Sequence, residues 1–143
     1  MKEKKNKIAK ETVDLMLEND EFSRWLGIEL LSLSPGYCKI SMTIRKEMLN
    51  GFGTAHGGIT YSFADSAFAF ASNSYGKVSV ALDVNMKYPK AVYDGDQLIA
   101  EATEKSKSKK VAMYKIIVTN QNNEIVGLFN GTVYRTKKKL LKK

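Results

Sequence analysis

The residue with the clearest potential for chemistry is Asp65, which lies inside the otherwise apolar segment 59–73, ITYSFADSAFAFASN. An ionised carboxylate in apolar surroundings is costly unless it is hydrogen-bonded or used in a reaction. Burial without a partner raises the pKa of such a group, whereas nearby donors or a helix dipole oppose the rise. The alternative is a structural aspartate, held by a Ser or Thr hydroxyl or by a subunit contact. Physical reasoning alone leaves both interpretations open.

A second candidate for chemistry is the sequence His56-Gly57-Gly58, at the point where a loop is expected to pass into a helix. Backbone N–H groups at a helix N-terminus are unpaired, and the helix dipole favours negative charge there. Two glycines let a ligand approach that backbone closely. Such an arrangement suits an oxyanion site for acyl transfer, although glycines before a helix also serve simply as a turn. His56, the single histidine, is either a structural hydrogen-bonding residue or a base.

The pattern of the whole chain predicts an α+β fold that positions these groups. Apolar spacing predicts an amphipathic helix over 7–19, which continues loosely and stops near Gly27. The segment 59–73 is apolar on nearly every face and therefore predicts a buried helix. An antiparallel sheet wrapped around that central helix is the simplest way to cover it. We expect six strands, at 28–33, 37–45, 78–88, 97–106, 111–119 and 124–134.

Composition and charge describe one globular domain of 143 residues, 43% of them apolar. The net charge of +8 is concentrated at the two ends, because residues 1–10 carry five lysines and one glutamate and residues 135–143 carry six basic residues. Such ends are most simply solvated, with steering of an anionic ligand or weak RNA adhesion as alternatives. The single Cys38 forms no internal disulfide, and no apolar run approaches the ~20 residues that cross a bilayer. We therefore expect a cytoplasmic protein with no membrane, nucleic-acid or metal partner.

Several motifs taken together are more specific than any one of them. They are Met48-x-Asn50, Gly53-x-x-His56-Gly57-Gly58, Ala64-Asp65-x-Ala67-Phe68-Ala69, Asn73-Ser74, Asp94-Gly95-Asp96-x-Leu98-x-Ala100 and Asn130-Gly131-Thr132. Through them the sequence resembles the PaaI-type branch of the hotdog-fold acyl-CoA thioesterases, the phenylacetic acid degradation-related family, over about residues 25–135. The resemblance implies a hotdog fold, in which an antiparallel sheet wraps around a long central helix, with an N-terminal helix added. It divides the chain into an N-terminal helical segment 1–24, a hotdog domain 25–136 and a basic tail 137–143.

The resemblance also implies an activity, the hydrolysis of an aryl-acyl or short- or medium-chain acyl-CoA without a cofactor. Asp65 would act as a general base on water or as a nucleophile that forms a mixed anhydride. The Gly57 N–H would polarise the thioester carbonyl, Asn50 would lie near that carbonyl or the water, and His56 would support the loop. Because the family builds each site from two subunits, a homodimer is required and a homotetramer is usual.

Further residues are candidate substrate contacts, either near the reacting group or at the phosphates of CoA. Several relatives place a water-holding Ser or Thr two residues before an acidic residue on the strand after the helix. If Asp83 is that acidic residue, Ala81 occupies the hydroxyl position; an alignment on Tyr88-Pro89 instead puts Asp83 itself there. The full set of candidate substrate contacts is Gly58, Asp83, Tyr88, Lys90, Lys107, Lys109 and Lys110. For these lysines, solvent coating or edge protection is the alternative role.

Three other functions compete with hydrolysis. An acyl-thioester dehydratase or hydratase of the same fold needs a histidine paired with an acid, and here the only histidine precedes Gly57-Gly58. A non-catalytic acyl-CoA binding module would keep the pocket without turnover. An RNA-binding protein would use the basic ends and bind in a salt-sensitive manner.

Overall fold

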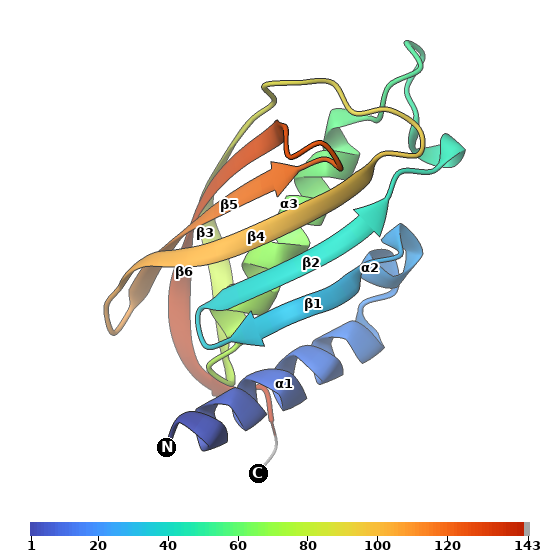
Figure 1. Cartoon of the computed structure of the whole chain (residues 1–143). Helices are drawn as coiled ribbons and strands as arrows, with labels where there is room; N and C mark the ends of the chain where they lie inside the picture. Colours follow the sequence, from blue (N-terminus) through green and yellow to red (C-terminus); the bar gives the residue numbers. More distant parts are fainter. Residues whose placement is uncertain (142–143) are drawn as a thin grey trace.

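A helix wrapped by a curved sheet forms the centre of the molecule. The structure, a computed structural model, describes residues 1–141. Its helices are α1 (Lys2–Asn19), α2 (Glu21–Leu26), the short 3-10 helix η1 (Lys46–Met48) and α3 (Gly57–Asn73). Its strands are β1 (Glu29–Ser34), β2 (Tyr37–Thr43), β3 (Lys77–Lys87), β4 (Gln97–Lys107), β5 (Val111–Thr119) and β6 (Ile125–Lys139). The expected α+β hotdog architecture is confirmed, including the helix at the N-terminus (Figure 1).

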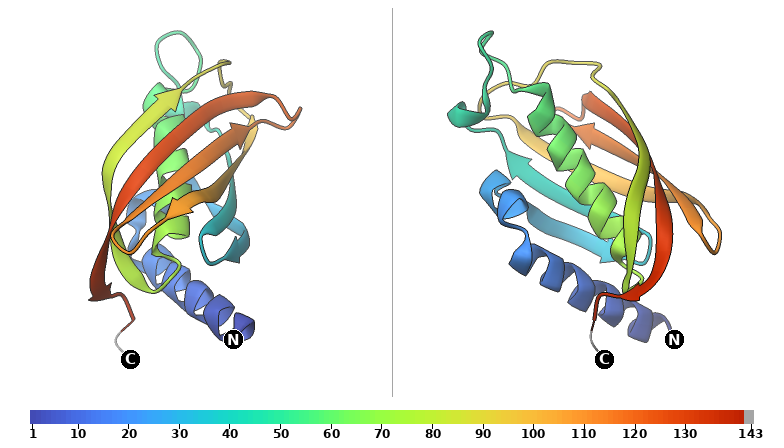
Figure 2. Two further views of the ribbon diagram at one scale, coloured as in Figure 1. Left: turned by 90° about the vertical axis from the view of Figure 1, so that its left-hand side faces the viewer. Right: turned by 180° about the vertical axis from the view of Figure 1, so that it is seen from behind.

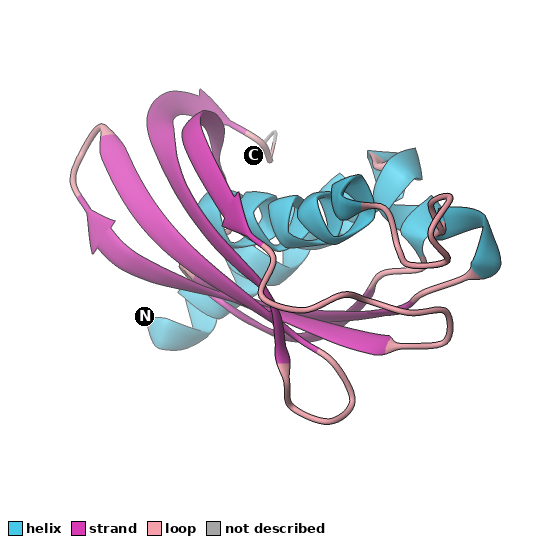
Figure 3. Ribbon diagram, turned by 90° about the horizontal axis from the view of Figure 1, so that it is seen from above, coloured by secondary structure: helices cyan, strands magenta, loops and turns pink. Residues whose placement is uncertain are grey.

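The six strands form one antiparallel sheet in the order β1-β2-β4-β5-β6-β3. Seen from behind, α3 crosses the concave face of the sheet, and α1 runs along the outside next to β1 (Figure 2). The view from above shows how strongly the sheet curves around the helix (Figure 3). Strands β1 and β3 are therefore the two edges of the sheet.

Helix α3 is buried because its residues match the curved sheet in size. Phe63, Phe68 and Phe70 are fully or almost fully buried, and alanines between them let the strands come close. The ring of Phe68 lies against Gly131 of β6, where an added Cβ would stand 2.6 Å from the ring. No larger residue fits at Gly131 without moving the ring or the strand.

The N-terminal helical segment is two helices, a difference from the continuous pattern that the sequence predicted. Asp20 ends α1 and caps α2, because its carboxylate accepts hydrogen bonds from the Ser23 N–H at 2.9 Å and from the Ser23 hydroxyl at 2.6 Å. The Ser23 and Ser66 hydroxyls lie 2.8 Å apart in the interior and form a hydrogen bond. The second helix is thereby tied to α3 next to Asp65.

The two basic ends are solvent-exposed, as expected, but most of their described residues belong to a helix and a strand. Helix α1 already begins at Lys2, and β6 continues to Lys139, well past the strand end predicted at 134. The Leu140 N–H then donates to the Gly76 carbonyl at 2.9 Å. Residues 137–141 of the predicted basic tail are thus mostly strand, and 142–143 lie outside the described residues.

Strand β3 is an edge with apolar side chains in solvent. Val80 is 46% exposed and Leu82 is 58% exposed, and the outer side of the strand pairs with no other described strand. Exposed apolar edges pair readily with another chain. Among the described residues, no helix has the length and apolarity needed to span a membrane.

Candidate active site

The start of α3 presents unpaired donors, as the sequence predicted. His56 is the N-cap with φ −53° and ψ 137°, and its side chain makes no capping hydrogen bond. Within residues 1–141, the N–H groups of Gly57 and Gly58 donate to no acceptor. Both glycines and His56 are exposed. Two amides of a helix start are thus directed at open space, where the dipole favours an anion or a polarised carbonyl oxygen.

Tyr88 supports this helix start from the end of β3. Its hydroxyl donates to the Gly57 carbonyl at 3.0 Å, and its ring would stand 3.5 Å from a Cβ added at Gly57. Tyr88 and Lys90 also border a small hollow beside Gly57, and Lys90 forms an ion pair with Glu124. The structure therefore brings the predicted residues Gly57, Gly58, Tyr88 and Lys90 to one end of α3.

Asn50 belongs to the same end, where it organises the preceding loop. Its Oδ1 accepts from the Phe52 N–H at 2.9 Å and the Thr54 N–H at 3.2 Å, and its Nδ2 donates to the Thr54 hydroxyl at 3.0 Å. A bridge between Leu49 and Ala55 closes this turn. The side chain is thus held by its own loop, with one Nδ2 hydrogen not used by the described residues.

Asp65 is half-buried near the middle of α3. Its carboxylate accepts no hydrogen bond and forms no ion pair within the described part of the chain. Burial, and to a lesser extent the nearby carboxylate of Asp20, raises the pKa of Asp65 above its ordinary value. The structural alternative, an aspartate satisfied by a hydroxyl of its own chain, finds no support in these contacts.

The spacing between Asp65 and Gly57 decides how the two can cooperate. Eight residues of α-helix correspond to about 12 Å along the axis. A single thioester group cannot touch a carboxylate and an amide that far apart. One chain therefore holds the two halves of the expected chemistry in separate places.

Tyr61 lies in the same part of α3 as Asp65, although the sequence analysis gave it no role. It lies one turn before Asp65, and its ring packs on Phe129 at 5.5 Å between centroids. Burial, then the charges of Asp65 and Tyr88, raise the pKa of its hydroxyl. Tyr61 thus lies between the carboxylate and the helix start, which a single sequence could not reveal.

The remaining predicted contacts lie elsewhere. Lys107, Lys109 and Lys110 belong to the hairpin between β4 and β5, near Tyr75 at the far end of α3. Asp83 is exposed on the edge strand β3, after a register irregularity at Ala81. In a single chain these four residues do not join the group around Gly57.

The sequence and the fold match a known class of protein. Residues 52–126 match the family model of the thioesterase superfamily. The chain therefore belongs to the thioesterase superfamily, and it is a thioester hydrolase of the PaaI type.

Particular relatives agree with this assignment. The acyl-coenzyme A thioesterase PaaI of Escherichia coli is 38% identical over 84% of this chain and 86% of that protein. The solved structure of the E. coli PaaI protein from the phenylacetic acid degradation operon has a TM-score of 0.91, at 34% identity over 94% of this chain and 97% of that one. A structure from Streptococcus mutans bound to acetyl CoA has a TM-score of 0.76 at 25% identity, covering 78% of this chain and 90% of that one.

Proposed function

We propose that the protein hydrolyses acyl-CoA thioesters at a site to which one copy contributes Asp65 and a second copy contributes the Gly57 helix start. The observation that carries the proposal is the unpartnered, half-buried Asp65 carboxylate on the same helix whose first amides are unpaired. Support for CoA as the thiol carrier comes from the E. coli relative, an acyl-coenzyme A thioesterase, and from the acetyl CoA bound to the S. mutans protein.

Hydrolysis of a thioester needs a carboxylate and a hydrogen-bond donor that polarises the carbonyl. The Gly57 N–H polarises the thioester carbonyl and stabilises the oxyanion that develops as the carbon becomes tetrahedral. The Asp65 carboxylate either removes a proton from an attacking water or attacks the carbonyl carbon itself. In both routes the C–S bond breaks, CoA leaves as its thiol, and water supplies the hydroxyl of the free acid. The raised pKa of Asp65 makes its carboxylate a stronger base than an ordinary aspartate.

A dimer through β3 is the arrangement that joins the two halves. Asp65 and Gly57 of one chain are separated by about 12 Å of helix, and β3 offers an unpaired edge with Val80 and Leu82 exposed. Pairing of two β3 strands in antiparallel fashion would bring two α3 helices together in opposite directions. The carboxylate of one helix would then approach the start of the other. A tetramer of such dimers is part of the same proposal.

Supporting roles follow from the contacts of each residue. Tyr88 holds the helix start through the Gly57 carbonyl, and Asn50 holds the loop before it while offering one Nδ2 hydrogen to the carbonyl or the water. His56 caps α3 with its main chain and faces solvent. Gly58 leaves the approach open, because a Cβ there would meet nothing within 4 Å.

The test is the release of CoA thiol from a panel of aryl-acyl and fatty acyl-CoAs by the wild type, Asp65→Asn and the control Asp94→Asn. Asp94 is an exposed carboxylate in the turn before β4. We expect hydrolysis of some members by wild type and control, and a loss of about 10²–10⁴-fold in kcat for Asp65→Asn. A wild type that is inert on every member, or an Asp65→Asn enzyme as active as the control, contradicts the proposal. An inert protein that still binds acyl-CoA would favour the non-catalytic binding module.

A further inference from the structure

A hollow lies between α1 and the two strands that end next to it. The first turns of α1 form one side, and the start of β3 with the end of β6 forms the other (Figure 2). Its volume of about 560 Å³ falls within the range of small-molecule sites. Its lining combines apolar side chains with lysines, so a ligand that fits it has an apolar part and a negative charge.

The apolar part of the hollow is formed by Ile8, Leu141 and the ring of Tyr75, all of them half-buried. Gly76 lets α1 come close, because an added Cβ there would stand 2.9 Å from Cγ2 of Ile8. The Leu140 N–H donates to the Gly76 carbonyl at 2.9 Å, which fixes the chain just before Leu141. These side chains are therefore held in place, and each keeps some apolar surface uncovered.

Two lysines of the hollow lie directly opposite each other in the sheet. Lys77 of β3 and Lys139 of β6 are register partners, and both line the hollow. Register partners of an antiparallel pair have Cβ atoms about 4.5–5.5 Å apart on one face, where like charges are destabilising. Within residues 1–141 neither lysine forms an ion pair. An anion placed between the two ammonium groups would remove their repulsion.

Helix α1 adds further positive charge from the opposite side. Lys4 and Lys7 both line the hollow, and Lys7 forms an ion pair with Glu11 at 3.9 Å. Among the described residues of the lining, four lysines face one glutamate, which leaves a net charge of +3. Cations from three separate elements thus surround a partly apolar space.

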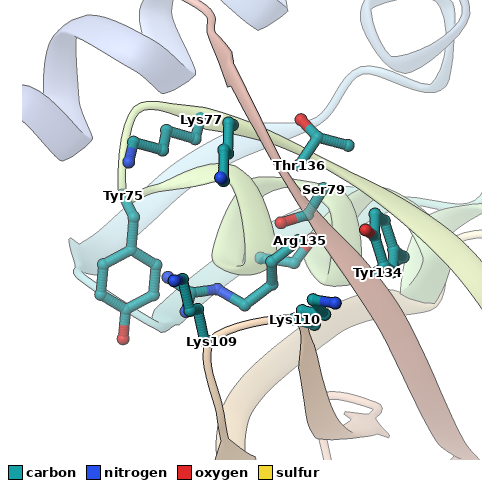
Figure 4. Close-up of a pocket in the computed structure, with 10 residues that line it drawn as sticks. Tyr75, Lys77, Ser79, Lys109, Lys110, Tyr134, Arg135 and Thr136 are labelled. Carbon is teal, nitrogen blue, oxygen red and sulfur yellow. The ribbon is translucent and has the colours of Figure 1, made fainter.

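The hollow differs in chemistry from the larger basic pocket next to it, which Lys109, Lys110 and Arg135 line (Figure 4). Tyr75 and Lys77 border both spaces. No Leu, Ile or Val is among the described residues that line the larger pocket, whereas the hollow has an aliphatic side chain on each of its two sides. A ligand with an aliphatic chain is therefore favoured in the hollow.

We propose that this hollow binds a free fatty acid of medium chain length, with its carboxylate between Lys77 and Lys139 and its chain along Ile8 and Leu141. The carboxylate balances the opposed lysines, and the chain covers the apolar side chains that water now touches. The proposal goes beyond the proposed function and does not depend on it, because neither Asp65 nor the helix start at Gly57 lines the hollow.

The experiment is a calorimetric titration of the full chain with decanoate and with hexanoate at low salt. The variant is Lys4→Ala with Lys139→Ala, and its control is Lys10→Ala with Lys138→Ala. The control removes the same charge from exposed positions of the same helix and strand, outside the hollow. We expect the Kd for decanoate to rise about fivefold in the variant and to stay unchanged in the control. In the wild type, decanoate should bind at least about tenfold more tightly than hexanoate, because its longer chain buries more apolar surface.

Several outcomes would overturn the fatty-acid site. They are a wild type that does not bind decanoate, a variant that binds it as tightly as the control, and equal affinities for decanoate and hexanoate, which would indicate a site for any small anion. Displacement of decanoate by free CoA would place the fatty acid in the acyl-CoA site and would also contradict the proposal. Because the titration measures binding without turnover, its result is independent of whether the protein hydrolyses acyl-CoA, and each proposal can fail alone.

Discussion

Replacing Gly57 by proline should remove one proposed catalytic donor, its backbone N–H, and leave the hydrogen bonds of the folded chain intact. The Gly57 N–H donates to no described acceptor, so its loss breaks no hydrogen bond of the folded chain. Proline is favoured at the first position of a helix, and the residue before it must be extended, which His56 already is at φ −53° and ψ 137°. The added Cβ meets the Tyr88 ring at 3.5 Å, an ordinary contact. We therefore expect Gly57→Pro to fold with a nearly unchanged Tm.

The expected cost is catalytic. Loss of one oxyanion donor lowers kcat by about 10²–10³-fold, which corresponds to roughly 3–4 kcal/mol of transition-state stabilisation. Gly57→Ala is the matched control, because it adds the same Cβ and keeps the N–H. The assay is CoA thiol release with the best substrate of the panel, alongside inhibition by free CoA to show that the proline ring does not block binding.

The reasoning fails if Gly57→Pro folds, binds CoA and turns over within a few-fold of Gly57→Ala. The thioester carbonyl would then be polarised elsewhere. If inhibition by CoA is lost together with turnover, the proline ring blocks the site, and the deficit no longer measures the donor.

Four further predictions concern the shared site, the Asp65 carboxyl group and the packing of α3. Chains carrying Asp65→Asn and chains carrying Gly57→Pro, refolded together, should regain about one quarter of wild-type activity. Half of the random dimers are mixed, and each mixed dimer keeps one of its two sites intact. No recovery of activity would mean that the sites are not shared between subunits. The pKa of Asp65 is raised by burial and by Asp20, so kcat/KM should fall on the acid side at a higher pH than for an ordinary aspartate. The variant Asp20→Asn keeps the helix cap and removes the charge, so it should move that fall to lower pH. The same raised pKa adds stability below the pKa of the unfolded state, and this contribution is lost as pH rises through the folded pKa; Asp65→Asn should remove the dependence in urea titrations. Gly131→Ala should cost about 1–3 kcal/mol in urea unfolding, because its Cβ would overlap a buried ring, whereas Gly51→Ala, with nothing within 4 Å, should cost little.

The elements of the fold could be predicted where local composition sufficed. The Ala- and Phe-rich segment 59–73 predicted a buried helix. The alternation of apolar and polar residues, together with the turn residues, predicted the strands. The break at Asp20 was missed because the apolar spacing continues through it, although Asp20 three residues before Ser23 is a recognisable capping pair. The end of β6 was missed because Thr136–Lys139 shows no apolar alternation. That part of the strand depends on pairing with β3, whose Lys77 lies opposite Lys139.

Only those parts of the candidate site that lie close together in the sequence could be predicted from it. The glycines before α3 and the lone carboxylate within it lie close in sequence, so their types and spacing could be read directly. The surroundings of Tyr61 come from residues of other elements, Phe129 and Tyr88, and no periodicity in the sequence indicates which residues of separate elements lie side by side. Asn50 was predicted to lie near the thioester carbonyl or the water, and the structure shows its hydrogen bonds within its own loop, to Phe52 and Thr54.

The position of the two chain ends has a practical consequence for anyone preparing this enzyme. Lys4 near one end and Leu141 near the other border a single hollow, which Lys7, Lys77 and Lys139 also line. An affinity tag fused to either end would therefore lie close to that hollow, and an acidic tag would be attracted to its lysines. Kinetic constants are best measured after the tag has been cleaved.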